Sequence, residues 1–186
     1  GEAVDHFDVT GHVFNDYDSG GFLGFHRWGE LRVFIDGRTP PYYTDDHFWA
    51  ARLAIEDPEV FRRLDAEHAF SAAIVPRDSA LCSALTESAD FAPVWFDGDR
   101  SLFLRGDPRE RLHHLAPCAT ESNVLRCLRG GTVDVYLDEM QRLLTISPHS
   151  GFLARLGELM SSRCGGGRPI PAQLIVVAVG QGKLQT

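Results

Sequence analysis

Short apolar runs alternate with helix-forming segments over residues 12–105, and this alternation constrains the fold more than any other feature of the chain. The clearest run is Leu31–Ile35, whose β-branched and aromatic residues are typical of a strand. The intervening segments carry apolar residues at helical spacing, and Thr44 and Pro58 suit the first positions of helices. Strands that alternate with helices form a mostly parallel sheet covered by helices. The sequence therefore predicts an α/β fold with a Rossmann-like, mostly parallel sheet.

Turn residues divide this region into elements. We interpret Asp16–Gly21 as a turn, in which Gly20-Gly21 permits a positive φ or the close approach of another group. Asp97-Gly98-Asp99 lies between two apolar runs, which indicates a hairpin that adds an antiparallel edge. We expect helices at about 45–56, from Asp57-Pro58 onwards and at Ala80–Glu87, and strands at His12–Asn15, Leu31–Ile35, Phe70–Val75, Phe91–Phe96 and Ser101–Leu104.

The sequence pattern changes after Gly106, where helical patterns alone replace the alternation of strand and helix patterns. Residues 1–106 carry a net charge of −10 and residues 107–186 one of +2, which supports a boundary at this point. We predict two domains, an α/β domain at 1–106 and an all-α helical tail at 107–186. The expected helices are Asp107–Leu115, Glu121–Leu128, Val133–Ile146 and Gly151–Arg163, and helix is also favoured over strand for Pro171–Leu184.

Composition excludes some classes of function. The net charge of −8 disfavours a nucleic-acid partner, because phosphate binding needs a basic face. No run approaches the roughly 20 apolar residues of a membrane span. The chain starts without Met, which suggests a piece of a longer protein, so missing targeting signals are uninformative. Of the four cysteines, Cys118 and Cys127 are candidates for a disulfide in an oxidising compartment.

Two polar clusters follow the first two expected strands, and they form the candidate binding site. Polar groups at the carboxyl ends of neighbouring parallel strands converge on one crevice, where ligands bind. A loop with two tyrosines follows the second cluster. The candidate residues are Asn15, Asp16, Tyr17, Asp18, Gly20, Gly21, Asp36, Gly37, Arg38, Tyr42 and Tyr43.

Each candidate has a structural interpretation beside the functional one. Asp16, Asp18 and Asp36 could bind a divalent cation or act as an acid–base pair, but we favour turn caps and an ion pair. Arg38 could clamp a phosphate, although an ion pair with Asp16 or Asp36 is favoured. Tyr17, Tyr42, Tyr43 and Trp28 suit either a platform for a sugar ring or packing. The sequence contains no phosphate-loop, dinucleotide or G-x-S-x-G motif, and its histidines do not show metal-ligand spacing, so no cofactor, resident metal or catalytic residue is assigned.

Several segments within about residues 1–106 carry a resemblance to a known family. They are VFNDYDSGGFL at 13–23, FIDGR at 34–38, Tyr42-Tyr43, the AIVP strand end at 73–76 with its Asp78 or Ser79 cap, and the hairpin from Trp95 to Arg105. These segments are similar to the soluble carboxy-terminal region of bacterial multi-spanning membrane glycosyltransferases of the lipid-sugar-dependent (GT-C-like) class. Phe22 stands where that family more often has tyrosine, and Ser19 where an aromatic residue is common.

The resemblance implies a function by association with a membrane protein. In that family the transfer chemistry is thought to reside in the transmembrane part. The resemblance therefore implies a non-catalytic domain on the extracytoplasmic face of a bacterial membrane. Its partners would be the parent transmembrane segment and a glycan or lipid-linked sugar. Residues 138–165 further resemble a fragment of a tetratricopeptide-type repeat. Two alternatives stay open: a Rossmann-like enzyme that binds a small molecule or nucleotide, and a protein-interaction module.

Overall fold

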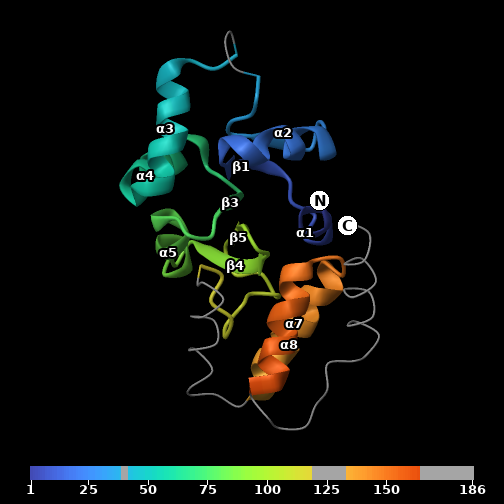
Figure 1. Ribbon diagram of the computed structural model, residues 1–186. Coiled ribbons are helices and arrows are strands. Elements are labelled where there is room, and N and C mark those ends of the chain that lie inside the picture. Colours follow the sequence, from blue (N-terminus) through green and yellow to red (C-terminus); the bar gives the residue numbers. More distant parts are fainter. Residues whose placement is uncertain (39–41, 119–132, 164–186) are drawn as a thin grey trace, which may run out of the picture.

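A five-stranded mixed sheet forms the centre of the computed structural model, which describes residues 1–38, 42–118 and 133–163. The strand order is β2-β1-β3-β5-β4, of which β1, β3, β5 and β4 are labelled in Figure 1. β1 is parallel to β2 and to β3, whereas β5 is antiparallel to both of its neighbours. The fold is thus α/β, with a parallel core and an antiparallel edge. The strands are β1 Gly11–Asn15, β2 Leu31–Val33, β3 Ala72–Pro76, β4 Phe91–Phe96 and β5 Arg100–Arg105.

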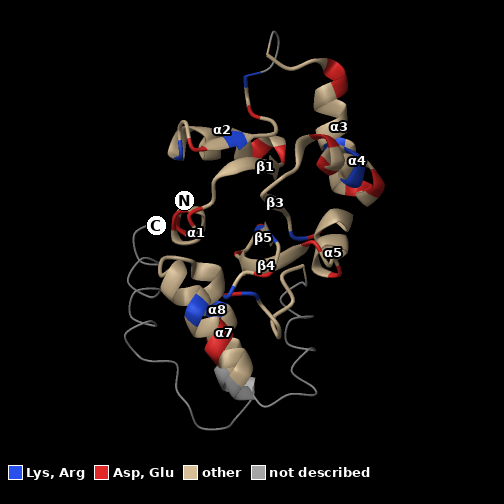
Figure 2. Cartoon of the chain, turned by 180° about the vertical axis from the view of Figure 1, so that it is seen from behind, with Lys and Arg blue, Asp and Glu red and all other residues tan. Residues whose placement is uncertain are grey.

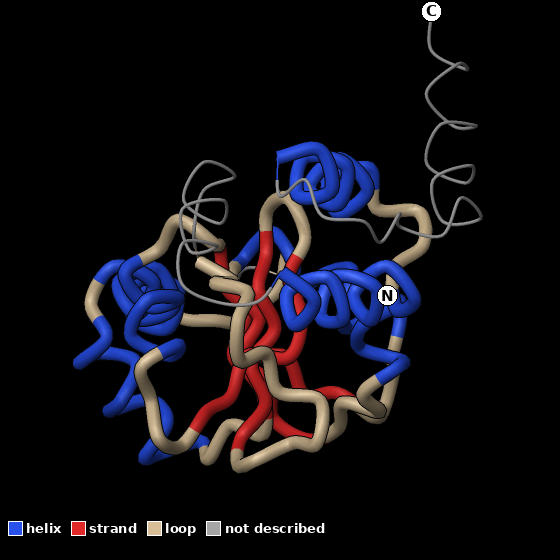
Figure 3. Tube along the Cα trace, turned by 90° about the horizontal axis from the view of Figure 1, so that it is seen from below, coloured by secondary structure: helices blue, strands red, loops and turns tan. Residues whose placement is uncertain are grey.

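The helices lie on both faces of this sheet, and Figure 3 shows the strands between them. α3, α4 and α5 pack on one face, while α1 and α2 cover the other. α7 and α8 pack together beside β4. The helices are α1 Glu2–His6, α2 Tyr17–His26, α3 Asp45–Glu56, α4 Pro58–His68, α5 Ala80–Thr86, α7 Val133–Ile146 and α8 Gly151–Arg163.

Alternating side chains in the strands create these two layers. In β1, Val13 joins the core under α1 and α2, whereas its neighbour Phe14 joins the core under α3 to α5. The same alternation recurs in β5, where Leu102 and Phe103 are buried on opposite faces. Because successive side chains of a strand point to opposite faces, such doubly buried strands require helices on both sides.

The sheet follows the predicted order of elements, but the position of the last strand was not anticipated. Five strands occur where five were predicted, and β4 has the predicted bounds, Phe91–Phe96. β5 lies between β3 and β4, so it is an internal strand, and β4 forms the edge. This arrangement brings Arg100 at the start of β5 opposite Pro76 at the end of β3.

Two predicted segments adopt another structure, and the strand predicted at Leu31–Ile35 is shorter, ending at Val33. Asp16–Gly21 is not a turn, because Asp16 caps α2 and the helix begins at Tyr17. Asp107–Leu115 contains turns and bends and no helix. Part of its backbone forms tertiary hydrogen bonds instead: the N–H of Leu112, for example, donates to the carbonyl of Pro93 at 2.7 Å. The predicted helices Glu121–Leu128 and Pro171–Leu184 lie outside the described residues, whereas Val133–Ile146 and Gly151–Arg163 match α7 and α8.

The cysteine pairing also differs from the predicted one. Cys118 forms a disulfide with Cys82, with Cα atoms 5.7 Å apart, and not with Cys127. Cys82 lies on α5 and is fully buried in the core beneath that helix. Spacing along the chain suggested the nearer partner, but the fold brings together residues 36 positions apart. The bond ties the segment that follows β5 to α5.

Candidate functional site

Asn15 joins the ends of β1 and β2 at the edge where the predicted site lies. Its side-chain amide is fully buried and donates to the carbonyl of Ile35 at 2.7 Å. Its oxygen accepts from the N–H of Phe34 at 2.9 Å, and its nitrogen also donates to the carbonyl of Asp16 at 2.8 Å. Both polar atoms of the Asn15 side chain are therefore bonded to backbone groups of the protein. We call this junction of the two strand ends the β1–β2 corner.

Gly20 completes the β1–β2 corner by allowing α2 to approach it. A Cβ atom on Gly20 would lie 1.8 Å from the carbonyl oxygen of Ile35 and 2.7 Å from Nδ2 of Asn15. Gly21 is different, because a Cβ there would meet nothing within 4 Å. Both residues have ordinary helical backbones, so the predicted close approach applies to Gly20 and the positive φ to neither.

Asp16 links the start of α2 to the hairpin of β4 and β5. One carboxylate oxygen accepts from the N–H of Ser19 at 3.3 Å and from its hydroxyl, which caps the helix. The other oxygen pairs with Arg100 at 2.7 Å. Sequence reasoning missed Arg100, which is 84 positions from Asp16 along the chain. Only the pairing of β5 with β3 would have indicated that Arg100 lies at this edge.

Asp36 and Arg38 form an ion pair beside the β1–β2 corner. The Nε of Arg38 contacts both carboxylate oxygens of Asp36, at 3.0 and 2.9 Å, and its Nη2 lies 2.6 Å from Oδ2. The N–H of Arg38 donates to the same carboxylate at 2.9 Å. These bonds from Arg38 lower the pKa of the buried Asp36, and in turn Asp36 raises the pKa of the exposed Arg38. Gly37 is the residue between them in the sequence.

Of the predicted tyrosines, Tyr42 and Tyr43 lie beside the Asp36–Arg38 pair, whereas Tyr17 packs on α3. Tyr17 packs edge-on against Phe48, with ring centroids 5.6 Å apart. Tyr43 stacks on His47, and burial raises the pKa of its phenol. Tyr42 is exposed beside Arg38, whose guanidinium carbon lies 5.8 Å from the ring centroid.

The three candidate carboxylates do not gather into a metal site. Asp16 is directed to Arg100 and Asp36 to Arg38, whereas Asp18 is exposed on the first turn of α2. Within residues 1–38, 42–118 and 133–163, no group of three His, Cys, Asp or Glu side chains is arranged to hold a metal ion. The first two carboxylates thus serve as a helix cap and as ion-pair partners.

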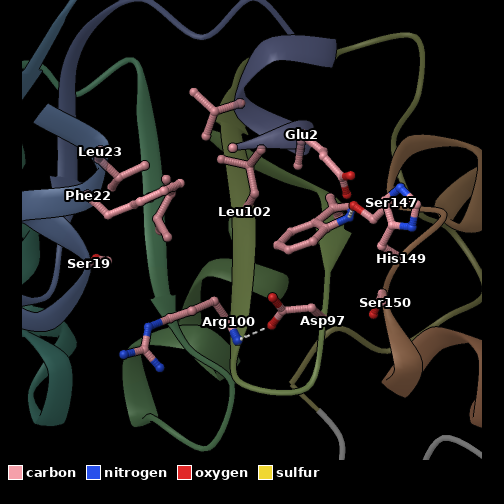
Figure 4. Close-up of a pocket in the computed structure, with 15 residues that line it drawn as sticks. Glu2, Ser19, Phe22, Leu23, Asp97, Arg100, Leu102, Ser147, His149 and Ser150 are labelled. Atoms are coloured by element: carbon pink, nitrogen blue, oxygen red, sulfur yellow. Dashed lines mark hydrogen bonds between the residues drawn. The ribbon is translucent and has the colours of Figure 1, made fainter. Parts of the chain in front are cut away.

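Three hollows surround α2. The aromatic groove, of about 600 Å³, runs between α2 and the open edge of β2 and includes Phe25, Trp28 and the Asp36–Arg38 pair. The α2–α3 cavity, of about 590 Å³, includes Asp16, Tyr17 and Asp18. The α2–β5 cavity, of about 460 Å³, lies between α2, β5 and the turn that joins α7 to α8 (Figure 4). The predicted site residues therefore border different hollows and do not share one crevice.

Comparison with known proteins adds no family. The chain matches no protein-family model, no curated protein and no solved structure. Among the described helices, none has the length and apolarity needed to cross a bilayer. The geometry of the site is accordingly the basis for a functional assignment.

Proposed function

We propose that the chain is a non-catalytic, extracytoplasmic accessory domain of a membrane glycosyltransferase-like protein, and that it assists the binding of an acceptor or partner. One observation carries the non-catalytic part of this proposal: the polar groups at the strand ends bond to one another. Asn15 bonds to the neighbouring backbone, Asp16 to Arg100, and Asp36 to Arg38. An active site needs groups that are left available to a substrate. The glycosyltransferase-like part rests on the resemblance of the segments at 13–23 and 34–38. The Rossmann-like character of the sheet and an all-α tail after residue 106 belong to the same proposal.

The disulfide supports the proposed compartment. Disulfides form and persist in oxidising surroundings and are rare in the reducing cytosol. Cys82 and Cys118 are within bonding distance, and Cys82 is buried in the core, so their bond contributes to the folded structure. A domain on the extracytoplasmic face of a bacterial membrane would fold where such a bond is stable.

The aromatic groove is the surface best suited to the proposed partner. Phe25 and Trp28 are 84% and 78% exposed, and contiguous exposed apolar side chains mark interaction sites. Arg32 lines the same groove and has no carboxylate partner among the described residues. Acidic side chains occur on α3 and α4 (Figure 2), and the carboxylate that lines the groove, Asp36, is paired with Arg38. An apolar chain that carries a phosphate, as in a lipid-linked sugar, matches this combination of aromatic and basic groups.

A titration with a short-chain polyprenyl-phosphate sugar tests the proposal. We expect Trp28→Ala to weaken binding about tenfold, as the loss of a central aromatic contact does. Trp49→Ala is the matched control, because Trp49 is 55% exposed on α3 and lies outside the groove. No binding by the native chain, together with turnover of a small substrate, would reject the proposal.

A second candidate function is a small-molecule or nucleotide binder of the Rossmann-like type. The α2–α3 cavity favours it, since Asp16 and Pro76 border this cavity at the carboxyl ends of β1 and β3. The chain leaves these two strands in opposite directions, which is where open α/β sheets bind ligands. A thermal-shift screen with nucleotides and methyl donors tests it. A stabilising hit that Asp16→Asn abolishes would favour this candidate, and a flat response would exclude it.

A further inference from the structure

The α2–β5 cavity is lined by none of the binding-site residues that were predicted from the sequence. It has a volume of about 460 Å³, within the range of pockets that enclose small organic ligands. Its apolar floor includes Ile74, Trp95 and Leu102. Figure 4 shows Ser19 and Arg100 on one side of this floor and Ser147, His149 and Ser150 on the other.

Two polar groups on the rim keep hydrogen-bonding capacity for a ligand. The Oδ1 atom of Asp97 holds the hairpin turn by accepting from the N–H groups of Asp99 and Arg100, both at 2.8 Å. Its Oδ2 atom has no hydrogen bond to the described residues. The hydroxyl of Ser147 accepts from the indole N–H of Trp95 at 3.1 Å, and its own proton is left to donate. The rim therefore offers both an acceptor and a donor.

The charges of the cavity disfavour an anionic ligand. Among the described residues, two cationic groups line the cavity. The guanidinium of Arg100 is paired with Asp16 at 2.7 Å, and the amino group of Gly1 interacts with the carboxylates of Glu2 and Asp97. Glu2 and Asp97 add two carboxylates to the lining. The first turn of α8 is capped by the hydroxyl of Ser150, which accepts from the N–H of Leu153 at 3.3 Å. A phosphate would meet carboxylates here, whereas a neutral ligand with many hydroxyl groups would not be repelled.

We propose that the α2–β5 cavity binds a neutral saccharide unit. The apolar C–H face of a pyranose ring packs on an aromatic and aliphatic floor, here Trp95 and Leu102. Its hydroxyl groups then bond to Asp97 and Ser147 on the rim. This site is separate from the aromatic groove. The proposal therefore places a sugar in a cavity that the proposed function does not use.

The test is a titration of the isotope-labelled chain with neutral hexoses and disaccharides, followed by amide chemical shifts. We expect saturable shifts at Asp97, Arg100 and Ser147. Asp97→Asn keeps an oxygen for the hairpin turn but removes the carboxylate, so it should weaken binding about tenfold. Asp99→Asn is the matched control, since Asp99 is exposed in the same turn and does not line the cavity. Equal melting temperatures of the two variants would show that the fold is retained.

Three outcomes would overturn this proposal. They are the absence of saturable shifts with every neutral sugar, equal affinities for Asp97→Asn and Asp99→Asn, and tighter binding of the corresponding sugar 1-phosphates. None of them bears on the aromatic groove, whose test uses Trp28→Ala and a lipid-linked ligand. Failure of the saccharide site and failure of the proposed function are therefore distinguishable.

Discussion

At the residue scale, the β1–β2 corner depends on a few residues. Some hold it together by side-chain hydrogen bonds, and Gly20 does so by leaving space for α2. Asn15 joins two strand ends with a single buried amide, and Gly20 lets α2 lie against them. Asp36 holds Arg38 through both its backbone and its side chain. Each of these roles makes a prediction about stability.

The adjacent glycines of α2 should respond to alanine in opposite ways. Gly20→Ala places a methyl group against the carbonyl of Ile35 and should lower the free energy of unfolding by about 3 kcal/mol. Gly21→Ala meets open space in a helix and should raise it by about 0.5 to 1 kcal/mol. Urea unfolding of both variants measures the difference. Equal effects of the two substitutions would contradict the close approach at Gly20.

The Asp36–Arg38 pair should make stability depend on acid pH. Because the bonds from Arg38 lower the folded pKa of Asp36, its contribution is complete above the unfolded value of 3.8. It is lost as the pH falls through the lower folded pKa. Asp36→Asn should therefore cost about 1 to 2 kcal/mol at neutral pH, and this cost should shrink towards about pH 3. A cost that is the same at both pH values in urea unfolding would contradict the ion pair.

At the element scale, single side chains connect the helices α7 and α8 with the segment after β5 and with the sheet. Glu139 of α7 is buried, and its carboxylate accepts from the N–H groups of His113, His114 and Leu115 at 2.6 to 3.2 Å. Next to β4, the guanidinium of Arg77 lies 4.8 Å from the ring centroids of both Phe96 and Phe152. The segment after β5 is thus ordered by contacts to α7 and to the sheet rather than by a helix of its own.

Glu139 offers a direct test of this attachment. Glu139→Gln removes the charge and leaves one oxygen for three N–H groups, so it should cost about 1 to 2 kcal/mol of unfolding free energy. Hydrogen exchange at the amides of 113–115 should accelerate in the same variant. Asp138→Asn is the control, because Asp138 is exposed on the same helix. Unchanged exchange in Glu139→Gln would show that the carboxylate does not order this loop.

At the scale of the whole molecule, the sequence was informative where local pattern decides structure. β4 and α7 have the predicted bounds because each carries a continuous pattern of its own. The start of α2 was missed because Gly20 and Gly21 weaken its helical pattern. The Asp16–Arg100 pair and the Cys82–Cys118 disulfide were missed because they depend on the neighbours that the sheet and α5 provide. Local patterns contain no information about such distant partners.

The central proposal is that the predicted polar cluster stabilises the fold and does not serve as a reaction centre. The unfolding free energy of Asn15→Ala tests it most directly. The substitution leaves the buried carbonyl of Ile35 and the N–H of Phe34 without the partners they now have. We predict a loss of about 3 kcal/mol in urea unfolding at neutral pH. An unchanged unfolding free energy would contradict this proposal. It would mean that Asn15 does not stabilise the fold, as expected of a residue whose role is to bind a ligand.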